Sequence, residues 1–329
     1  MQAAQYTEVS DDLTTIKLNA VDKPTPSPGL AVVKVHVAAV NPIDYMVMRG
    51  YLVGAGWSLP LPFTVGYDFA GEVESVDPSD AGASFAAGDK VFAVNWGQHK
   101  HNEDPHPVAG TIAEYIKIPL KMLSKVPDGV TMDQAAAVAL VGTTAYQILF
   151  DCAKLTAGSK VLILGGPSSV GHLAIQLAKA KGAWVATTTS ARNLDYVKQF
   201  NPDLIINYNE EKWEEVEALK GIDAIVDTVG EKDGFAKSSG VVKPDGAFVS
   251  ISAQDAGFDP TAHAPLSFAA FYCLKNSATV QDELAAMVAA GTLKVVIGQT
   301  FPFTLEGVHA ALKQVESGKS NGKNIIHMV

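Results

Sequence analysis

The chain has 329 residues, enough for two domains with a sizeable core, and its 47% hydrophobic and 18% charged residues exclude a largely disordered protein. The net charge of −10 repels phosphate backbones and anionic lipids, so we expect neither nucleic acid nor a membrane as a partner. Two cysteines are too few for a disulfide scaffold or a Cys-rich zinc site, and the absence of a signal peptide or a run of about 18 apolar residues predicts a cytoplasmic location.

The first part of the chain carries short strand-like runs separated by turn residues. The clearest run, 31–40, alternates valine with small or polar residues, and runs at 71–76 and 90–94 follow it. Pro- and Gly-rich segments lie between them. The pattern predicts an irregular β-rich domain over residues 1–125.

From residue 126 the sequence pattern changes to alternating strands and helices. Thr131 and Gln134 form a candidate capping box ahead of an alanine-rich helix. Apolar strands are then predicted at 161–164, 184–189, 204–206, 222–226 and 247–251. Such alternation is typical of a parallel sheet covered by helices on both faces. We therefore expect a doubly wound α/β domain over residues 126–274. A C-terminal segment, 275–329, follows with further helices and one strand.

The strongest chemical signal is the turn after the first of these strands, from Gly165 to Gly171. Glycines permit a tight turn and close backbone approach, and the following helix offers N–H groups to a pyrophosphate. The predicted binding residues are Gly166, Pro167, Ser168, Ser169 and Val170. Because Ser168 replaces a middle glycine, we expect its hydroxyl to bond a phosphate oxygen.

The end of the second strand indicates which dinucleotide binds. An NAD site has an acid about 20 residues after the glycine turn, and none is present here. Ser190 and Arg192 stand there instead, and both donate hydrogen bonds to a 2′-phosphate. The sequence therefore predicts NADPH; the alternative is that Arg192 begins a solvated helix.

Eight short motifs, in order, resemble those of the zinc-free quinone oxidoreductases, the zeta-crystallin-like branch of the medium-chain dehydrogenase/reductase family. They are Asn41-Pro42-Ile43-Asp44, Gly66 to Val73, Gly88 to Val91, Gly110 to Tyr115, Gly142 to Tyr146, Gly165 to Gly171, Asp227 to Gly230 and Gly322-Lys323. The resemblance covers nearly the whole chain. It implies a Rossmann domain beside a GroES-like catalytic domain to which the C-terminal segment returns.

The resemblance also implies a site without metal. The positions that match the zinc ligands of zinc-dependent relatives hold Asn41, Tyr67-Asp68 and Leu140. These side chains do not form the tetrahedral N/S site of catalytic zinc. His99, His101 and His106 lie in a polar stretch typical of a solvated loop. Metal-free hydride transfer suits quinones and α,β-unsaturated carbonyls, because conjugation spreads the negative charge that forms.

Four residues become candidates for the reacting end of the site. In the family the Asn of the Asn-Pro-Ile-Asp segment lies near the nicotinamide, which implies this role for Asn41, with Asp44 organising the wall beside it. Tyr51 and Tyr67 are candidate donors to the substrate oxygen. The alternatives are a turn that caps a strand for the first two residues and packed aromatics for the tyrosines.

The resemblance adds four cofactor contacts. Thr143 would lie at the nicotinamide end and Tyr208 beside the 2′-phosphate, while Asn321 and Lys323 would return to the cofactor from the C-terminal segment. The alternatives are a strand-end aromatic for Tyr208 and a solvated charge for Lys323.

Together these features predict an NADPH-dependent quinone or enone reductase that acts on a small molecule, and the resemblance implies a homodimer. One alternative is an enoyl-thioester reductase acting on enoyl-CoA or an acyl carrier protein. The other is a non-catalytic NADPH-binding regulator.

Overall fold

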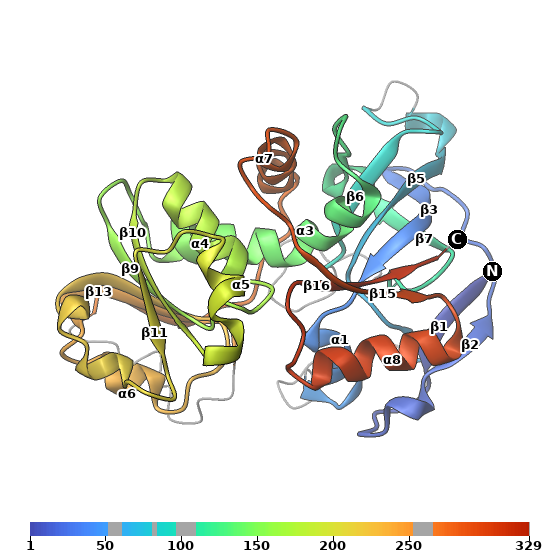
Figure 1. Cartoon of the computed structure of the whole chain (residues 1–329). Helices are drawn as coiled ribbons and strands as arrows, with labels where there is room; N and C mark the ends of the chain where they lie inside the picture. Colours follow the sequence, from blue (N-terminus) through green and yellow to red (C-terminus); the bar gives the residue numbers. More distant parts are fainter. Residues whose placement is uncertain (52–60, 81–83, 97–109, 253–265, 329) are drawn as a thin grey trace. The chain divides into compact units, whose positions relative to one another are not determined.

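A computed structural model describes residues 1–51, 61–80, 84–96, 110–252 and 266–328. The chain divides into two compact units, shown in Figure 1. The first comprises Met1–Leu140, Lys275–Gly291 and Val295–Val329, and the second comprises Val141–Leu274 and Thr292–Lys294. The change of unit falls inside a helix, later in the chain than the expected boundary at 125, and the functional domain boundaries stay a prediction.

The first unit is built on β-sheets. Its strands are β1 (Gln2–Tyr6), β2 (Lys17–Ala20), β3 (Leu30–Ala39), β4 (Phe63–Thr64), β5 (Asp68–Val76), β6 (Lys90–Val94), β7 (Tyr115–Pro119), β8 (Ser124–Lys125), β15 (Ile297–Pro302) and β16 (Lys323–His327). Its helices are α1 (Pro42–Met48), α7 (Ala278–Ala289) and α8 (Leu305–Glu316), with short 3₁₀ turns at Leu13–Thr15, Pro78–Asp80 and Leu120–Met122.

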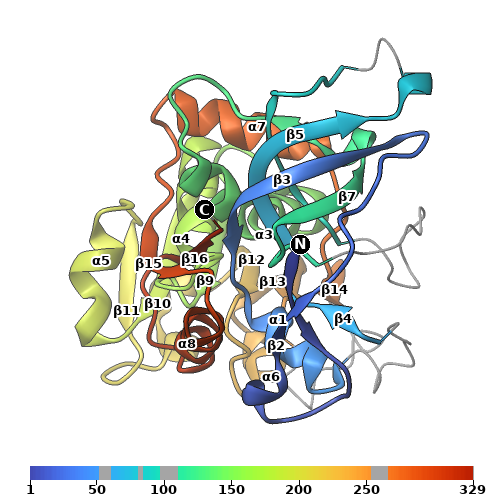
Figure 2. The ribbon, with the colours of Figure 1, turned by 90° about the vertical axis from the view of Figure 1, so that its right-hand side faces the viewer.

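The main sheet of this unit has the order β15-β16-β3-β5-β6-β8, with β7 also paired to β3. Strand β3 is antiparallel to both β16 and β5, and Figure 2 shows β3 and β5 as long strands side by side. Along β3 the valines are buried, whereas Lys34 and His36 are half-buried. From Val33 to Val37 this period of two agrees with the alternation that predicted the strand, while toward both ends of β3 residues on both faces are buried. Helix α8 packs along β15 and β16 (Figure 1).

The second unit is a six-stranded parallel sheet. Its strands are β9 (Lys160–Leu164), β10 (Trp184–Thr189), β11 (Leu204–Asn207), β12 (Ile222–Asp227), β13 (Val242–Ser250) and β14 (Phe268–Phe271). Its helices are α4 (Gly171–Ala180), α5 (Leu194–Lys198) and α6 (Gly234–Ser238), with 3₁₀ turns at Ala191–Asn193, Trp213–Glu215 and Glu217–Leu219. The strand order β11-β10-β9-β12-β13-β14 is that of a Rossmann fold, which confirms the predicted fold class.

Helix α3 (Met132–Tyr146) runs from the first unit into the second and continues as a π-helical turn, Gln147–Cys152. The predicted capping box is present, because Thr131 Oγ1 accepts from Gln134 N and Gln134 Oε1 accepts from Thr131 N. By length and composition, Met132–Cys152 could cross a membrane, although the sequence analysis found no such stretch. Most of it is buried within the fold, and a core helix meets the same criterion.

Candidate functional site

The turn between β9 and α4 contains all five residues predicted to hold the pyrophosphate. Gly165 has φ +85°, and a Cβ built there would lie 2.3 Å from Val229 Cγ1. A Cβ on Gly171 would lie 2.2 Å from the Gly165 carbonyl oxygen. Both positions therefore require glycine, and the turn is anchored to β10 because Gly165 N donates to Thr188 Oγ1 at 3.0 Å. A glycine cradle before a helix N-terminus fits a pyrophosphate.

The hydroxyl of Ser168 forms two hydrogen bonds at this turn. It accepts from Gly171 N at 2.8 Å and lies 2.8 Å from Thr228 Oγ1. The serine at the middle position thus bonds the backbone N–H of Gly171, the first residue of helix α4, and links the turn to the segment after β12. The hydroxyl has a structural role, and its contact with a phosphate oxygen stays a prediction.

Asp227 organises the segment that faces the glycine turn, a role that the sequence analysis did not assign. Its carboxylate accepts from the backbone N–H groups of Val229 and Gly230, each at 3.0 Å, and from Ser250 Oγ at 3.1 Å. Burial raises the pKa of Asp227, while these hydrogen bonds oppose the rise. The sequence signal is an acid that follows the buried apolar run 224–226 at the end of β12.

Three predicted 2′-phosphate residues lie at the carboxyl ends of β10 and β11. These strands pair in parallel, and Tyr208 N donates to Thr189 O at 3.1 Å, which places Tyr208 next to the end of β10. Ser190 is half-buried, Arg192 is exposed and Tyr208 is 58% exposed. Among the described residues, no acidic side chain forms an ion pair with Arg192. An exposed arginine and an exposed tyrosine at the carboxyl ends of neighbouring strands fit a phosphate ester.

Thr143 lies in helix α3 within the second unit and is fully buried. Within the described ranges its hydroxyl has no hydrogen-bond partner. A buried hydroxyl of this kind is unfavourable unless a ligand or water satisfies it. The observation fits a cofactor contact, and the contact stays a prediction.

The reacting-end candidates form a buried polar cluster in the first unit. Asn41 caps helix α1, Pro42 follows as its first residue, and Asp44 Oδ2 accepts from Asn41 N at 2.7 Å. Asn41 Nδ2 donates to Asp68 Oδ1 at 2.9 Å, and Lys323 Nζ donates to Asn41 Oδ1. Lys323 Nζ also lies 3.6 Å from Asp68 Oδ2.

The ionisable side chains of this cluster have shifted pKa values, because they and Asn41 are each at most 2% exposed. Burial raises the pKa of Asp44 to about 8, with the Asp68 carboxylate adding to the rise and the bond from Asn41 N opposing it. Burial also raises the pKa of Asp68 and lowers that of Lys323, and the attraction within this pair opposes both changes. The cluster contains two carboxyl groups, Asp44 and Asp68, and one ammonium group, Lys323. When Asp44 carries a proton, the negative charge of Asp68 balances the positive charge of Lys323 and the cluster is neutral.

The remaining candidates lie at different depths in the first unit. Tyr67 is 1% exposed and packs on Trp96, with ring centroids 4.9 Å apart. Burial and the nearby Asp44 charge hold the pKa of Tyr67 well above its usual value. Tyr51, after helix α1, is half-buried, and Asn321, before β16, is exposed. The cluster therefore joins Asn41, Asp44 and Lys323, and the alternative of a solvated Lys323 is wrong because this side chain is only 1% exposed.

The sequence analysis named Asp68 only for its position in a motif and assigned it no role. A single acid between Tyr67 and Phe69, in a buried run, was the available signal.

The cluster does not fit a zinc ion. Zinc sites use Cys, His and carboxylate ligands, whereas here an amide oxygen and a carboxylate are engaged by a lysine ammonium. In the part of the chain that the structure describes, no three His, Cys, Asp or Glu side chains are grouped to hold a metal. His99, His101 and His106 lie outside the described residues. The metal-free site stays a prediction.

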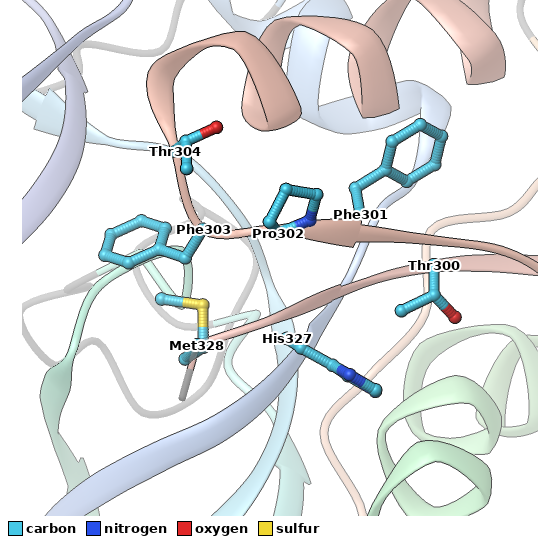
Figure 3. A pocket seen from close by; sticks show the side chains of 7 residues that line it. All are labelled: Thr300, Phe301, Pro302, Phe303, Thr304, His327 and Met328. Atoms are coloured by element: carbon cyan, nitrogen blue, oxygen red, sulfur yellow. The ribbon is translucent and has the colours of Figure 1, made fainter.

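A cavity of about 460 Å³ lies elsewhere in the first unit (Figure 3). Its lining residues come from β15, the turn into α8 and the end of β16: Thr300, Phe301, Pro302, Phe303, Thr304, His327 and Met328. It contains none of the predicted site residues.

Two family models match the chain. Residues 27–128 match the alcohol dehydrogenase GroES-like domain, and residues 200–326 match the zinc-binding dehydrogenase model. The chain is 30% identical to a 2-methylene-furan-3-one reductase of Solanum lycopersicum, covering 100% of this chain and 79% of the relative. It is also 30% identical to a chloroplastic NADPH-dependent alkenal/one oxidoreductase of Arabidopsis thaliana, covering 90% of this chain and 72% of the relative.

Among solved structures, the quinone oxidoreductase from Coxiella burnetii matches with a TM-score of 0.83 and 29% identity, covering 100% of this chain and 99% of that one. The strand order of the second unit and its glycine turn point to the same family as these similarities do. The chain belongs to the medium-chain dehydrogenase/reductase family.

Proposed function

We propose that the protein is an NADPH-dependent reductase that transfers hydride to a quinone or an α,β-unsaturated carbonyl. The observation that carries the proposal is the glycine turn after β9 together with an exposed Arg192, which follows the neighbouring strand β10 and has no acidic partner in the described residues. The names of the relatives, which are alkenal/one, furanone and quinone reductases, support the acceptor class.

The residues of the second unit would hold the cofactor. Backbone from Gly166 to Val170 would bind the pyrophosphate, and Ser190, Arg192 and Tyr208 would bind the 2′-phosphate. Thr143 would supply its buried hydroxyl to the nicotinamide end. NADPH, when bound, supplies the hydride.

A conjugated acceptor suits the polar cluster of the first unit. Reduction of an isolated ketone places full negative charge on one oxygen, which a metal or strong acid usually stabilises. Since the cluster does not fit zinc, an acceptor that spreads this charge by conjugation is the better substrate.

Turnover by metal-chelated protein tests the proposal. Loss of the near-ultraviolet absorbance of reduced nicotinamide would be followed with NADPH or NADH and benzoquinone, phenanthrenequinone or a 2-alkenal. We expect turnover that prefers NADPH and is insensitive to chelator. Turnover with enoyl-CoA alone would favour the thioester reductase, and NADPH binding without turnover of any acceptor would favour the regulator.

We also propose a cytoplasmic homodimer that does not depend on nucleic acid or membrane. Strand β14 ends the order of the parallel sheet, and its residues Phe268–Phe271 are apolar, so it is the natural edge for pairing with a second copy. Sedimentation equilibrium measures the mass in solution, and a monomer at all concentrations would contradict the dimer.

A further inference from the structure

The carboxamide of Asn41 is held at both ends by side chains of opposite charge. Its Nδ2 donates to Asp68, and its Oδ1 accepts from Lys323. We propose that Asp68 and Lys323 are positioning residues that hold this carboxamide in one orientation for the reaction. The inference rests on the proposed function for its catalytic meaning, whereas the clamp itself is independent of it.

The sheet topology explains why these three residues meet. Asn41 follows the end of β3, and Asp68 and Lys323 are the first residues of β5 and β16. Strand β3 lies between β5 and β16 and is antiparallel to both. The start of each neighbour therefore lies beside the end of β3, on either side of Asn41.

Because Asp68 and Lys323 carry opposite charges, they favour one orientation of the Asn41 carboxamide, which a neutral pocket would not. The oxygen and nitrogen of an amide have nearly the same shape, so only hydrogen bonding distinguishes its two orientations. A flipped Asn41 would point N–H groups at the Lys323 ammonium and an oxygen at the Asp68 carboxylate. Both buried ions would lose a hydrogen bond and face a repulsive dipole, so the observed orientation is enforced.

The main chain of Asn41 is fixed as well. Asp44 accepts from Asn41 N, and Asp44 Oδ1 has no hydrogen-bond partner among the residues described. A neutral Asp44 balances the cluster, so Asp68 and Lys323 compensate each other and neither can be removed alone. Burial, and at higher pH the ionised Asp44, raise the pKa of Tyr6 and Tyr67, so both phenols stay neutral beside the cluster.

The test compares single and paired removal of the charges. Asp68→Asn or Lys323→Met alone leaves a buried ion without its partner, and we expect each to lower the melting temperature. The double variant D68N/K323M contains no unpaired ion, and we expect it to recover most of that loss. The matched control, D89N/K125M, removes a partly exposed ion pair of the same unit in which Lys125 Nζ lies 3.1 Å from Asp89 Oδ2.

If the clamp positions Asn41, the folded double variant loses turnover although its charges are balanced. We expect kcat to fall about 10- to 100-fold while the NADPH dissociation constant stays unchanged, since misplacement affects the reacting geometry. The D89N/K125M control should keep wild-type kcat. A folded double variant with wild-type kcat would overturn the inference and leave the proposed function intact.

A second measurement is made on the wild-type protein and needs no turnover. The side-chain amide signals of Asn41 in the NMR spectrum of the wild-type protein are assigned by their loss in Asn41→Asp. The clamp predicts protons at Nδ2 that exchange slowly with water, because both ends of the amide are engaged and buried. Fast exchange would refute the clamp, even if the wild-type protein reduced no acceptor and the proposed function failed.

Discussion

The buried cluster predicts that replacing Asp44 with Asn changes how stability depends on pH. Burial raises the pKa of Asp44 to about 8 in the folded protein, whereas an aspartate in an unfolded chain has a pKa of about 3.9. Asparagine keeps an oxygen that can accept from Asn41 N at the Asp44 position but carries no titrating proton. The variant therefore removes the titration and keeps the helix cap.

The direction and size of this pH dependence follow from the difference in proton binding between the folded and the unfolded protein. Between about pH 4 and pH 8 the unfolded chain ionises at position 44 while the folded protein keeps the proton, so rising pH favours unfolding. The contribution of Asp44 is fully present below pH 4 and is lost as pH rises through about 8. The wild-type protein should lose up to about 1.4 kcal/mol per pH unit relative to Asp44→Asn.

Urea unfolding, followed by circular dichroism at three pH values between 5 and 7, measures this difference in slope. Over two pH units the variant should gain up to about 3 kcal/mol relative to wild type. Asp195→Asn, on the surface of α5 with a 97% exposed side chain, is the matched control and should keep the wild-type slope. Equal slopes for wild type and Asp44→Asn would refute the proton on Asp44.

Three further substitutions test the second unit. Arg192→Ala should raise the NADPH dissociation constant roughly 10- to 100-fold without affecting NADH, because a charged hydrogen bond contributes about 1.5–3 kcal/mol; Lys198→Ala is the control, and equal losses for both nucleotides would reject the 2′-phosphate contact. Thr143→Val should leave the unfolding free energy unchanged or raise it by about 1 kcal/mol, since its hydroxyl has no partner in the described residues, yet weaken NADPH binding several-fold in a fluorescence titration. Gly171→Ala should lower the unfolding free energy by about 1–3 kcal/mol, because its Cβ would meet the Gly165 carbonyl; wild-type stability in urea would contradict this.

Much of the second unit could be predicted because its signals are local. Short apolar strand segments, a glycine turn and a helix with period 3.6 are each visible within a short window. Gly165 and Gly171 needed no long-range information, since the strand before and the helix after them specify a tight turn. The parallel sheet followed from the alternation of strands and helices, whereas the order of its strands comes from the structure.

The polar cluster could be predicted only in part. Asn41, Pro42 and Asp44 carry the signal of a capped helix, but helix α1 has only seven residues and no apolar period. The contact between Lys323 and Asn41 joins residues 282 positions apart, and no local pattern specifies such a pairing. The resemblance brought both residues into the candidate site in separate roles, and only the fold shows that they touch.

Transfer of deuterium from NADPH to the product is the most direct test of hydride transfer to a conjugated acceptor. NADPH carrying deuterium at the transferable position of nicotinamide C4 would be incubated with the protein and an enone, and the product examined by NMR and mass spectrometry. Hydride transfer to a conjugated acceptor predicts one deuterium on the β-carbon of a saturated carbonyl product. Deuterium on the carbonyl carbon of an alcohol product, or oxidation of NADPH with no deuterium in the product, would contradict it.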